Sequence, residues 1–479
     1  MKQAIVLVHG IGEQRPSETA RGFAAALAGG SSFVRSQPSR LSESVGLRRF
    51  FMKPKKDRPP TTDIYEFYWA HHMNQSSWGS VLGWAGRLLF TDYALPRGLR
   101  AAHRALITLF LGSILLVAWA AFPSFSGEGG SWVIPHPRIA VTTIVFGLIL
   151  YFCVSRFVRR FLGDAARYLT PSPENIKARN AVRREGIELL RRLHESKDYV
   201  RIIVVGHSLG SVIAYDVLRH VWEDLRKAKY QEAFDQPAME ELLDSISALE
   251  DSVRDKTYGA KLEAFQHAQH QLWREQRKLG VPWLVTDFIT LGSPLAHAPY
   301  MLESDFELFE EKKKQQELPV CPPYSSEDDP MFYKRKVKID SGGEGSRYWT
   351  FRVLSHGALF ACTRWTNLYF PYRKFFFGDI VGGPVSKVLG KGIRDIRVRP
   401  SEPGFWAKTL ASHTKYWKYP FDVVVDPGSQ KTASKTKGSK ESIKRRAKDR
   451  ATGTKEAFRA LQASLRLGLK LSKKDWPPP

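Results

Sequence analysis

The chain has 479 residues and a formal net charge of +25, from 73 Lys and Arg against 48 Asp and Glu. A chain of this length exceeds what one compact core usually needs, so we expect one large domain with insertions or appendages. The three cysteines, Cys153, Cys321 and Cys362, have no close spacing, which argues against a disulfide framework and a cysteine-based zinc site and fits a reducing compartment.

The N-terminal residues predict the start of a buried sheet. Residues 2–8 form a continuous apolar run that ends at His9 and Gly10, typical of a strand buried on both faces of a parallel sheet. The run is too short for a signal peptide, and no small-residue cleavage site follows it. Residues 22–60 carry only a weak helix signal, and the aromatic-rich residues 61–70 predict a second strand.

Two apolar stretches, residues 105–127 and 139–155, contain no charged residue. Each approaches the roughly 20 residues that a helix needs to cross a bilayer, so residues 104–158 predict a transmembrane hairpin that enters the membrane through 105–122 and 139–155. Arginines flank both outer ends, and the positive-inside rule therefore places both termini on the cytoplasmic side of the cell inner membrane. Two buried helices of a soluble core, or a re-entrant hairpin, are alternatives.

A nucleophile elbow is predicted in the middle of the chain. Residues 171–196 have the apolar spacing of an amphipathic helix, and residues 200–205 are almost pure Ile and Val, which predicts a strand. The stretch "VVGHSLGSV" then places Ser208 between Gly206 and Gly210, and residues 209–222 predict a helix. Strand, Gly-x-Ser-x-Gly and helix in this order are typical of a nucleophilic serine. A serine in an ordinary turn is the alternative.

The elbow also predicts an oxyanion hole. A serine hydroxyl reacts only when a base takes its proton and the developing oxyanion is stabilised. The N–H of Leu209, at the start of the helix, is one expected donor, and Ile11 or Gly12 in the loop after the first strand offers the other. His207 belongs to the elbow itself, and we expect His9 to orient the loop rather than to act as a base.

The later part of the chain predicts further helices and strands. Residues 228–279 are charged and helical, and residues 226–280 are predicted as a cap or lid insertion. Residues 283–291 predict a strand that ends in "LGSP", and residues 303–339 read as loop or cap. Further strands are expected at 347–354, 365–370 and 393–398.

The base should be a histidine beyond the last strand, and the acid should lie between serine and histidine in the sequence. His413 in "LASHTKYW" meets the first condition, and Asp379, before a glycine-rich turn, meets the second. The competing residues are His356 as base and Asp340, Asp328 and Asp329 as acids.

The tail, residues 427–479, holds 15 Lys and Arg against 4 Asp and Glu. This composition predicts a largely disordered segment. An amphipathic helix on anionic lipid is the alternative near its end, where apolar residues recur at helical intervals (Phe458, Leu461, Leu465 and Leu469). Interleaved aromatics and a recognisable module are missing, so nucleic-acid binding is not predicted.

Neither a metal nor a cofactor is predicted. His71 and His72 are adjacent rather than one helical turn apart, which disfavours ligation. A phosphate-binding Gly-x-x-x-x-Gly-Lys loop is also missing from the sequence. The mechanism as inferred needs no cofactor.

The motifs resemble, in their order, the α/β-hydrolase superfamily, and in particular its lipase- and esterase-like serine hydrolases. They are "VLVHGIGEQ", "YEFYWA", "VVGHSLGSVIAYDVL", "DFITLGSPLA", "WTNLYFP", "GDIVGGPV" and "SHTKYW". The resemblance implies an α/β fold, a mostly parallel sheet with flanking helices, made by residues 1–95 and 160–426. It also implies a triad of Ser208, Asp379 and His413. The chain departs from the pattern at 370–377, where relatives often carry an acidic residue and this sequence has none.

The sequence therefore predicts a membrane-anchored serine ester hydrolase of the carboxylesterase or lipase class. It would cleave an acyl ester through an acyl-enzyme, with a lipid ester as one candidate substrate. The alternative is a non-catalytic membrane scaffold or interaction protein that retains a hydrolase fold, because fold alone does not fix function. The sequence does not indicate an oligomeric state.

Overall fold

The structure is a computed structural model. It describes residues 2–11, 15–28, 34–39, 41, 47–52, 61–73, 112, 124–125, 132–133, 168–169, 173–228, 233–252, 257–303, 305–339, 347–372, 378–379, 381–400, 413–417 and 455–467.

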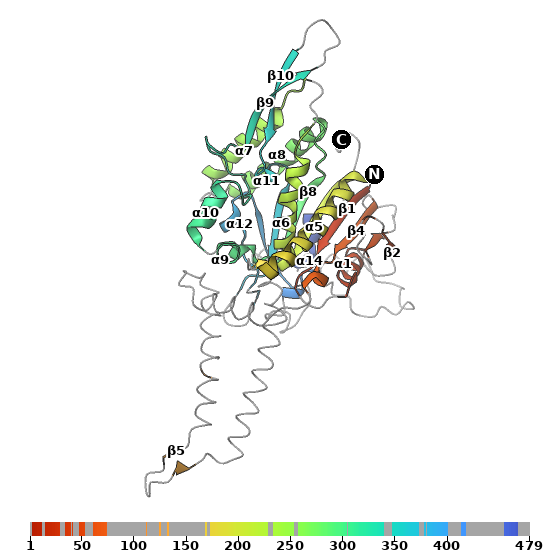
Figure 1. The fold of residues 1–479 in the computed structure, drawn as a ribbon, viewed down its shortest axis with the longest axis vertical. Coiled ribbons are helices and arrows are strands. Elements are labelled where there is room, and N and C mark those ends of the chain that lie inside the picture. The colour runs from red at the N-terminus through yellow and green to blue at the C-terminus, as the bar shows by residue number, and fades with distance from the viewer. Residues whose placement is uncertain are drawn as a thin grey trace, which may run out of the picture.

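A nine-stranded, mostly parallel mixed sheet forms the centre of the molecule (Figure 1), in the order β13-β12-β11-β8-β7-β1-β4-β3-β2. Seven strands run parallel: β1 (Lys2–Val8), β4 (Thr61–Phe67), β7 (Tyr199–His207), β8 (Val285–Leu291), β11 (Arg364–Tyr369), β12 (Arg394–Arg399) and β13 (Lys455–Glu456). Two antiparallel strands, β2 (Val34–Pro38) and β3 (Arg48–Met52), form one edge. The predicted strands at 2–8, 61–70, 200–205, 283–291, 365–370 and 393–398 are confirmed.

Helices cover both faces of the sheet (Figure 1). One face carries α5 (Pro173–Glu195), α6 (Leu209–Leu225) and α8 (Tyr258–Lys278), and the other carries α1 (Glu18–Ala28) and α14 (Ala457–Leu465). Because side chains alternate along a strand, Val204 packs on the α6 face, whereas Ile203 and Val205 pack on the opposite face. A strand such as β7 is therefore buried on both sides, as its unbroken Ile and Val run predicts.

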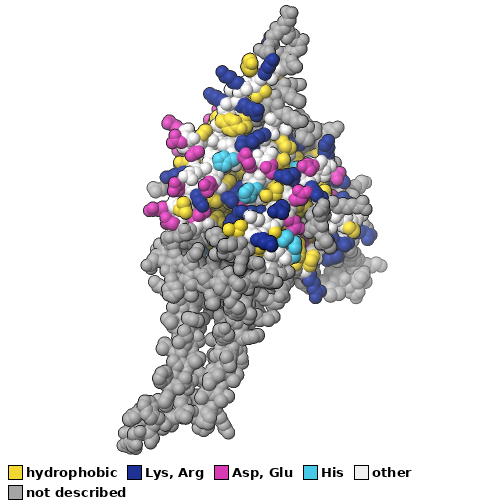
Figure 2. Space-filling model, viewed as in Figure 1, with side chains coloured by type: hydrophobic (Ala, Val, Ile, Leu, Met, Phe, Trp, Pro, Cys, Tyr) yellow, Lys and Arg dark blue, Asp and Glu magenta, His cyan; other side chains and the backbone are white. Residues whose placement is uncertain are grey.

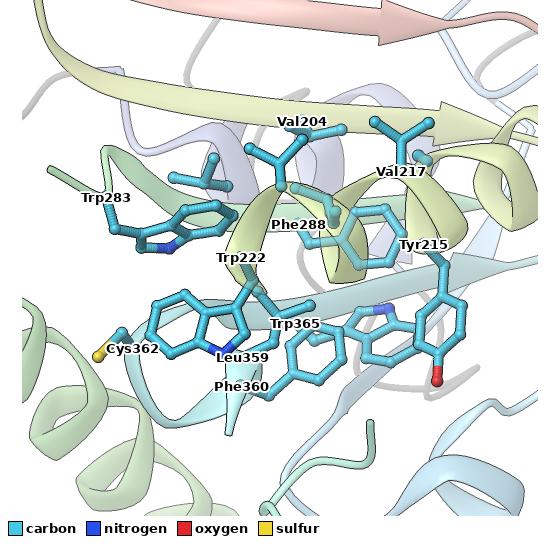
Figure 3. Close-up of a cluster of buried hydrophobic side chains, with 14 of the residues drawn as sticks. Val204, Tyr215, Val217, Trp222, Trp283, Phe288, Leu359, Phe360, Cys362 and Trp365 are labelled. Carbon is cyan, nitrogen blue, oxygen red and sulfur yellow. The ribbon is translucent and has the colours of Figure 1, made fainter. Parts of the chain in front are cut away.

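An aromatic cluster fixes α6 against the sheet (Figure 3). Trp222 of α6 meets Trp283 edge to face, with ring centroids 5.2 Å apart, and Trp365 of β11 stacks on Phe360 of α11 (Leu359–Cys362) at 4.6 Å. The Tyr215 hydroxyl donates a hydrogen bond to the carbonyl of Pro319 at 2.9 Å. Large interlocked rings of this kind resist displacement, so α6 is held at a fixed position on the sheet.

The charged helices of residues 226–280 lie far from that N-terminus. Nε2 of Gln269, on α8, donates to the carbonyls of Phe360 at 2.6 Å and Thr363 at 3.2 Å. Nε1 of Trp273 donates to the Trp283 carbonyl at 3.0 Å. These acceptors precede β8 and β11, so α8 lies at the amino ends of the strands, whereas β7 reaches the elbow at its carboxyl end. The prediction of a cap over the site is therefore wrong for α8.

Packing explains why composition misled here. Besides its exposed charged residues, α8 buries an apolar stripe of Leu262, Phe265, Ala268, Leu272 and Trp273 and, beside it, polar residues such as Gln269 and Glu275. The preceding helix α7 (Pro237–Asp251) packs against α8 and receives from it a cap, since a Glu275 carboxylate oxygen accepts the Ala238 N–H at 2.8 Å.

The end of the tail is part of the folded domain, whereas the sequence suggested a disordered or lipid-bound segment. Strand β13 pairs with β12, and α14 buries Ala457, Phe458, Ala460, Leu461 and Leu465. The guanidinium of Arg201, fully buried on β7, donates to the carbonyls of Leu465 at 2.9 Å and Arg466 at 3.3 Å. Because the last carbonyls of a helix have no partner within it, this cation caps α14 and binds it to the sheet.

The strands β9 (Phe332–Ile339) and β10 (Arg347–Leu354) form a separate antiparallel ribbon, which projects from the sheet (Figure 1). Its outer positions are basic (Figure 2), among them Lys334, Arg335, Lys336 and Arg347. The strand expected at 347–354 is thus confirmed but outside the main sheet. The stretch 303–339, expected as loop or cap, contains α10 (Phe306–Lys314) as well as β9.

The predicted membrane hairpin lies almost wholly outside the described residues. Between residues 74 and 167, the structure describes Gly112 and the short antiparallel strands β5 (Ser124–Phe125) and β6 (Trp132–Val133). Among the helices that it does describe, none combines the length and the apolar character needed to cross a bilayer.

Candidate active site

Ser208 lies at the sharp turn between β7 and α6, at the carboxyl edge of the sheet. Its backbone has φ 52° and ψ −132°, a conformation that a residue with a side chain rarely adopts and that persists only where the surroundings enforce it. The Ser208 N–H donates to the Leu291 carbonyl at the end of β8, at 3.0 Å. This strained turn between strand and helix is the geometry that the sequence predicts for a nucleophile elbow.

Gly206 and Gly210 make this turn possible. A Cβ atom on Gly206 would lie 2.5 Å from Cα of Ser211, and one on Gly210 would lie 2.2 Å from the carbonyl oxygen of His9. Both contacts are with backbone atoms, which cannot move aside as a flexible side chain can. The start of α6 therefore packs directly on the end of β1, and both positions require glycine.

Two of the predicted oxyanion donors, Leu209 and Ile11, lie in segments that adjoin this serine. A Cβ on Gly10 would lie 2.8 Å from Cβ of Ser208, so the loop that leads to Ile11 touches the elbow. Leu209 is the first residue of α6, and the first N–H groups of a helix have no acceptor within it. Gly12, the other expected donor, lies outside the described residues.

Asp379 and His413, 34 residues apart in the sequence, are brought together. Nδ1 of His413 donates to Oδ2 of Asp379 at 2.8 Å. Burial of Asp379, which is 1 % exposed, raises the pKa of its carboxyl, but His413 and further hydrogen bonds outweigh this effect and the pKa lies below its ordinary value. With the Nδ1 proton held by the carboxylate, Nε2 of His413 is left as the proton acceptor.

Three neighbours that the sequence analysis did not identify support Asp379. The Tyr416 hydroxyl donates to Oδ2 at 2.9 Å, and the Val381 N–H donates to Oδ1 at 2.9 Å. Gly292 has φ +56°, and a Cβ there would lie 2.8 Å from Oδ2. Tyr416 follows His413 by three residues, and Gly292 is the glycine of "LGSP". These two motifs are the sequence features from which the contacts of Asp379 could have been predicted.

His207 also has a role that the elbow motif does not reveal. Its Nε2–H donates to the backbone carbonyl of His413 at 2.8 Å, and the two rings lie 5.1 Å apart. The ring also packs edge to face on Trp417 at 4.8 Å. Burial lowers the pKa of His207 to about 3, so it is a neutral donor at physiological pH. The residue next to the serine thus holds the backbone of His413.

His9 is placed as expected, behind the loop. Its ring is fully buried, stacks on Trp69 at 5.1 Å, and donates from Nδ1 to the Gly10 carbonyl at 2.8 Å. Burial lowers its pKa to about 4. A neutral ring bonded to the loop backbone is suited to orienting that loop.

The competing base His356 and two of the competing acids, Asp328 and Asp329, lie at the other end of α6. Nε1 of Trp222 donates to the Ser355 carbonyl at 3.1 Å, and Trp222 lies about 20 Å along the helix from Ser208 at 1.5 Å per residue. His356 follows Ser355 and is exposed, as are Asp328 and Asp329. The Ser355 hydroxyl and the Asp329 carbonyl both bind the Gln316 side chain, so these residues share that distant end. Asp340 lies outside the described residues.

One group of side chains in the described part of the chain could hold a metal ion. His71, His72 and Glu185 offer one ligand atom each, and these atoms lie within 4.8 Å of one another. The sequence disfavours ligation by His71 and His72 because they are adjacent rather than one helical turn apart, and their structural partner Glu185 lies 113 positions beyond His72.

Comparisons of the chain with protein-family models, curated proteins and solved structures found no match.

Proposed function

We propose that this protein is a serine ester hydrolase with the α/β-hydrolase fold, in which Ser208 is the nucleophile, His413 the general base and Asp379 the acid. The observation that carries the proposal is the 2.8 Å hydrogen bond from His413 to a buried Asp379. It occurs beside a serine held at φ 52° between strand and helix.

The contacts around the three residues support one shared site. His207, adjacent to Ser208, is bonded to the His413 backbone at 2.8 Å. The Ser208 N–H donates a hydrogen bond to the Leu291 carbonyl at 3.0 Å. Gly292, which follows Leu291, lies against the Asp379 carboxylate. Ser208, His413 and Asp379 are thus joined through immediate sequence neighbours, and their order in the chain is the one that α/β-hydrolases use.

The mechanism follows from these roles. His413 takes the hydroxyl proton at Nε2 while Oγ of Ser208 attacks the carbonyl carbon of the ester. The N–H of Leu209 and the backbone of the Ile11 and Gly12 loop stabilise the oxyanion. His413 then protonates the departing alcohol, and a water activated by the same ring hydrolyses the acyl-enzyme, which restores Ser208.

The substrate class is inferred from two uncharged segments of the sequence. The uncharged segments 105–122 and 139–155 would anchor the domain at the cytoplasmic face of a membrane. An enzyme tethered there meets apolar acyl esters at high local concentration. We therefore propose a lipid-like ester as substrate, with no metal or cofactor in the reaction.

Hydrolysis of chromogenic esters tests the proposal. The detergent-solubilised chain should hydrolyse p-nitrophenyl esters, and Ser208→Ala or His413→Gln should lower kcat/KM by at least about 10³-fold. His356→Gln is the matched control, because this exposed histidine lies at the far end of α6. Unchanged hydrolysis in Ser208→Ala would contradict the proposal.

A further inference from the structure

A cluster of two imidazoles and a carboxylate, which the proposed reaction does not use, lies on the surface. The short helix η2 (Ala70–Met73) follows β4 and carries His71 and His72, whose ring centroids are 3.8 Å apart. Both face Glu185 of α5, with Oε2 of Glu185 3.4 Å from Nε2 of His71 and 2.7 Å from Nε2 of His72.

The two separations from Glu185 are close to those of a tetrahedral metal site, and all three ligand atoms lie within 4.8 Å of one another. Zinc binds imidazole nitrogen and carboxylate oxygen at about 2.1 Å, so two ligand atoms around it lie about 3.4 Å apart. His71 and Glu185 already meet this distance at 3.4 Å. His72 and Glu185, at 2.7 Å, need to separate by about 0.7 Å, a movement within the reach of a side-chain rotation.

The surroundings orient the ligands and leave a position open. Two contacts hold the ring of His71 in one orientation: a hydrogen bond to the Tyr68 backbone, and stacking on the Tyr68 ring with the centroids 5.8 Å apart. A second hydrogen bond of this kind is the usual support of a metal-binding histidine. The side chains of His71, His72 and Glu185 are 42 %, 25 % and 17 % exposed, so an ion can enter and retain a water as its fourth ligand.

We propose that His71, His72 and Glu185 bind one divalent transition-metal ion of the zinc class. Two histidines and one carboxylate form a known zinc ligand set with an open fourth position. The ion ties η2 to α5, the two described elements that flank residues 74–167. The ion also stabilises the loop after β1. Tyr68, which stacks on His71, lies 5.3 Å from the His9 ring, and His9 forms a hydrogen bond with the Gly10 carbonyl in that loop.

Metal titration of the full chain tests this inference. The protein is purified in detergent without a histidine tag, treated with a chelator, dialysed and titrated with Zn²⁺ alone by calorimetry. We expect one tight zinc site per chain, and an affinity at least about tenfold weaker in Glu185→Gln and in His72→Gln. At one zinc concentration, the thermal unfolding midpoint should rise in the unsubstituted chain and in the control, and should rise clearly less in the two variants.

His267→Gln is the matched control. His267 faces Glu241 at 3.6 Å, a surface pair of the same residue types that belongs to no such three-residue group among the described residues. Its substitution should leave zinc binding unchanged. If Glu185→Gln fails to fold, His71→Gln, which removes the most exposed of the ligands, provides the same comparison. Equal zinc affinity in all these proteins, or none at micromolar zinc, would mean that Glu185 and the histidines form only an ion pair.

Discussion

Replacement of Leu461 by alanine tests whether the end of the tail belongs to the fold. Leu461 is fully buried in the cluster between α14 and the sheet. A buried Leu→Ala substitution costs about 2–5 kcal/mol, from the lost transfer free energy and the cavity that remains. We expect the free energy of unfolding to fall by about 3 kcal/mol. At about 2.1 cal/mol/K of unfolding entropy per residue, that loss lowers the unfolding midpoint of a chain of this size by about 3 °C.

The assay is thermal and urea unfolding of the detergent-solubilised chain, followed by tryptophan fluorescence. Leu308→Ala is the control, because Leu308 also lies on a nine-residue helix, α10, but is 36 % exposed, and its replacement should change stability by less than about 0.5 kcal/mol. If Leu461→Ala is as mild as Leu308→Ala, α14 does not contribute to the core. The capping of α14 by Arg201 would then contribute nothing to the free energy of unfolding.

Three further predictions concern the site. His207→Ala should lower the esterase kcat several-fold at every pH. The rate should recover in part in His207→Gln, because the glutamine amide can donate a hydrogen bond to the His413 carbonyl over a similar distance. Equal rates in both variants would show that this hydrogen bond does not support the reaction. Gly210→Ala should abolish activity and lower stability, because its Cβ would meet the His9 carbonyl oxygen at 2.2 Å; a normal rate and midpoint in that variant would refute the close packing of α6 on β1. The pKa values of His9, about 4, and His207, about 3, lie below the value of about 6.5 in the unfolded chain. The unfolded chain therefore binds more protons in acid than the folded chain does. The free energy of unfolding should fall as the pH drops from 6.5 toward 4, by at most about 1.4 kcal/mol per pH unit for each histidine. Urea unfolding at a series of pH values measures this slope, which should be shallower in His207→Gln.

Much of the sheet was predictable because its strands carry their own signal. The apolar runs before His9 and before Ser208 are buried on both faces, and such runs read as strands without further information. The antiparallel strands β2 and β3 were missed. The edge strand β2 has the mostly polar sequence "VRSQP" and is only partly covered. Strand β3, "RRFFM", lies between β2 and β4 and buries Phe50, but its residues do not alternate, and its pairing partners set its conformation.

Contacts distant in sequence account for the other differences. The spacing of Phe458, Leu461 and Leu465 predicts an amphipathic helix, but only the position of Arg201 shows that its apolar face meets protein rather than lipid. The same holds for α8, whose buried stripe is hidden by its charged face. For the site, residue type and order suggest Asp379 and His413, whereas the support from Tyr416 depends on how the last segment folds back.

The measurement closest to the central claim is labelling of the detergent-solubilised chain by a fluorophosphonate, with the modified peptide mapped by mass spectrometry. The account predicts labelling at Ser208 that is lost in Ser208→Ala and strongly slowed in His413→Gln and Asp379→Asn. The controls His356→Gln and Asp328→Asn should label at the unsubstituted rate. Labelling elsewhere, or none in a chain shown to be folded, would contradict the assignment of Ser208 as an activated nucleophile.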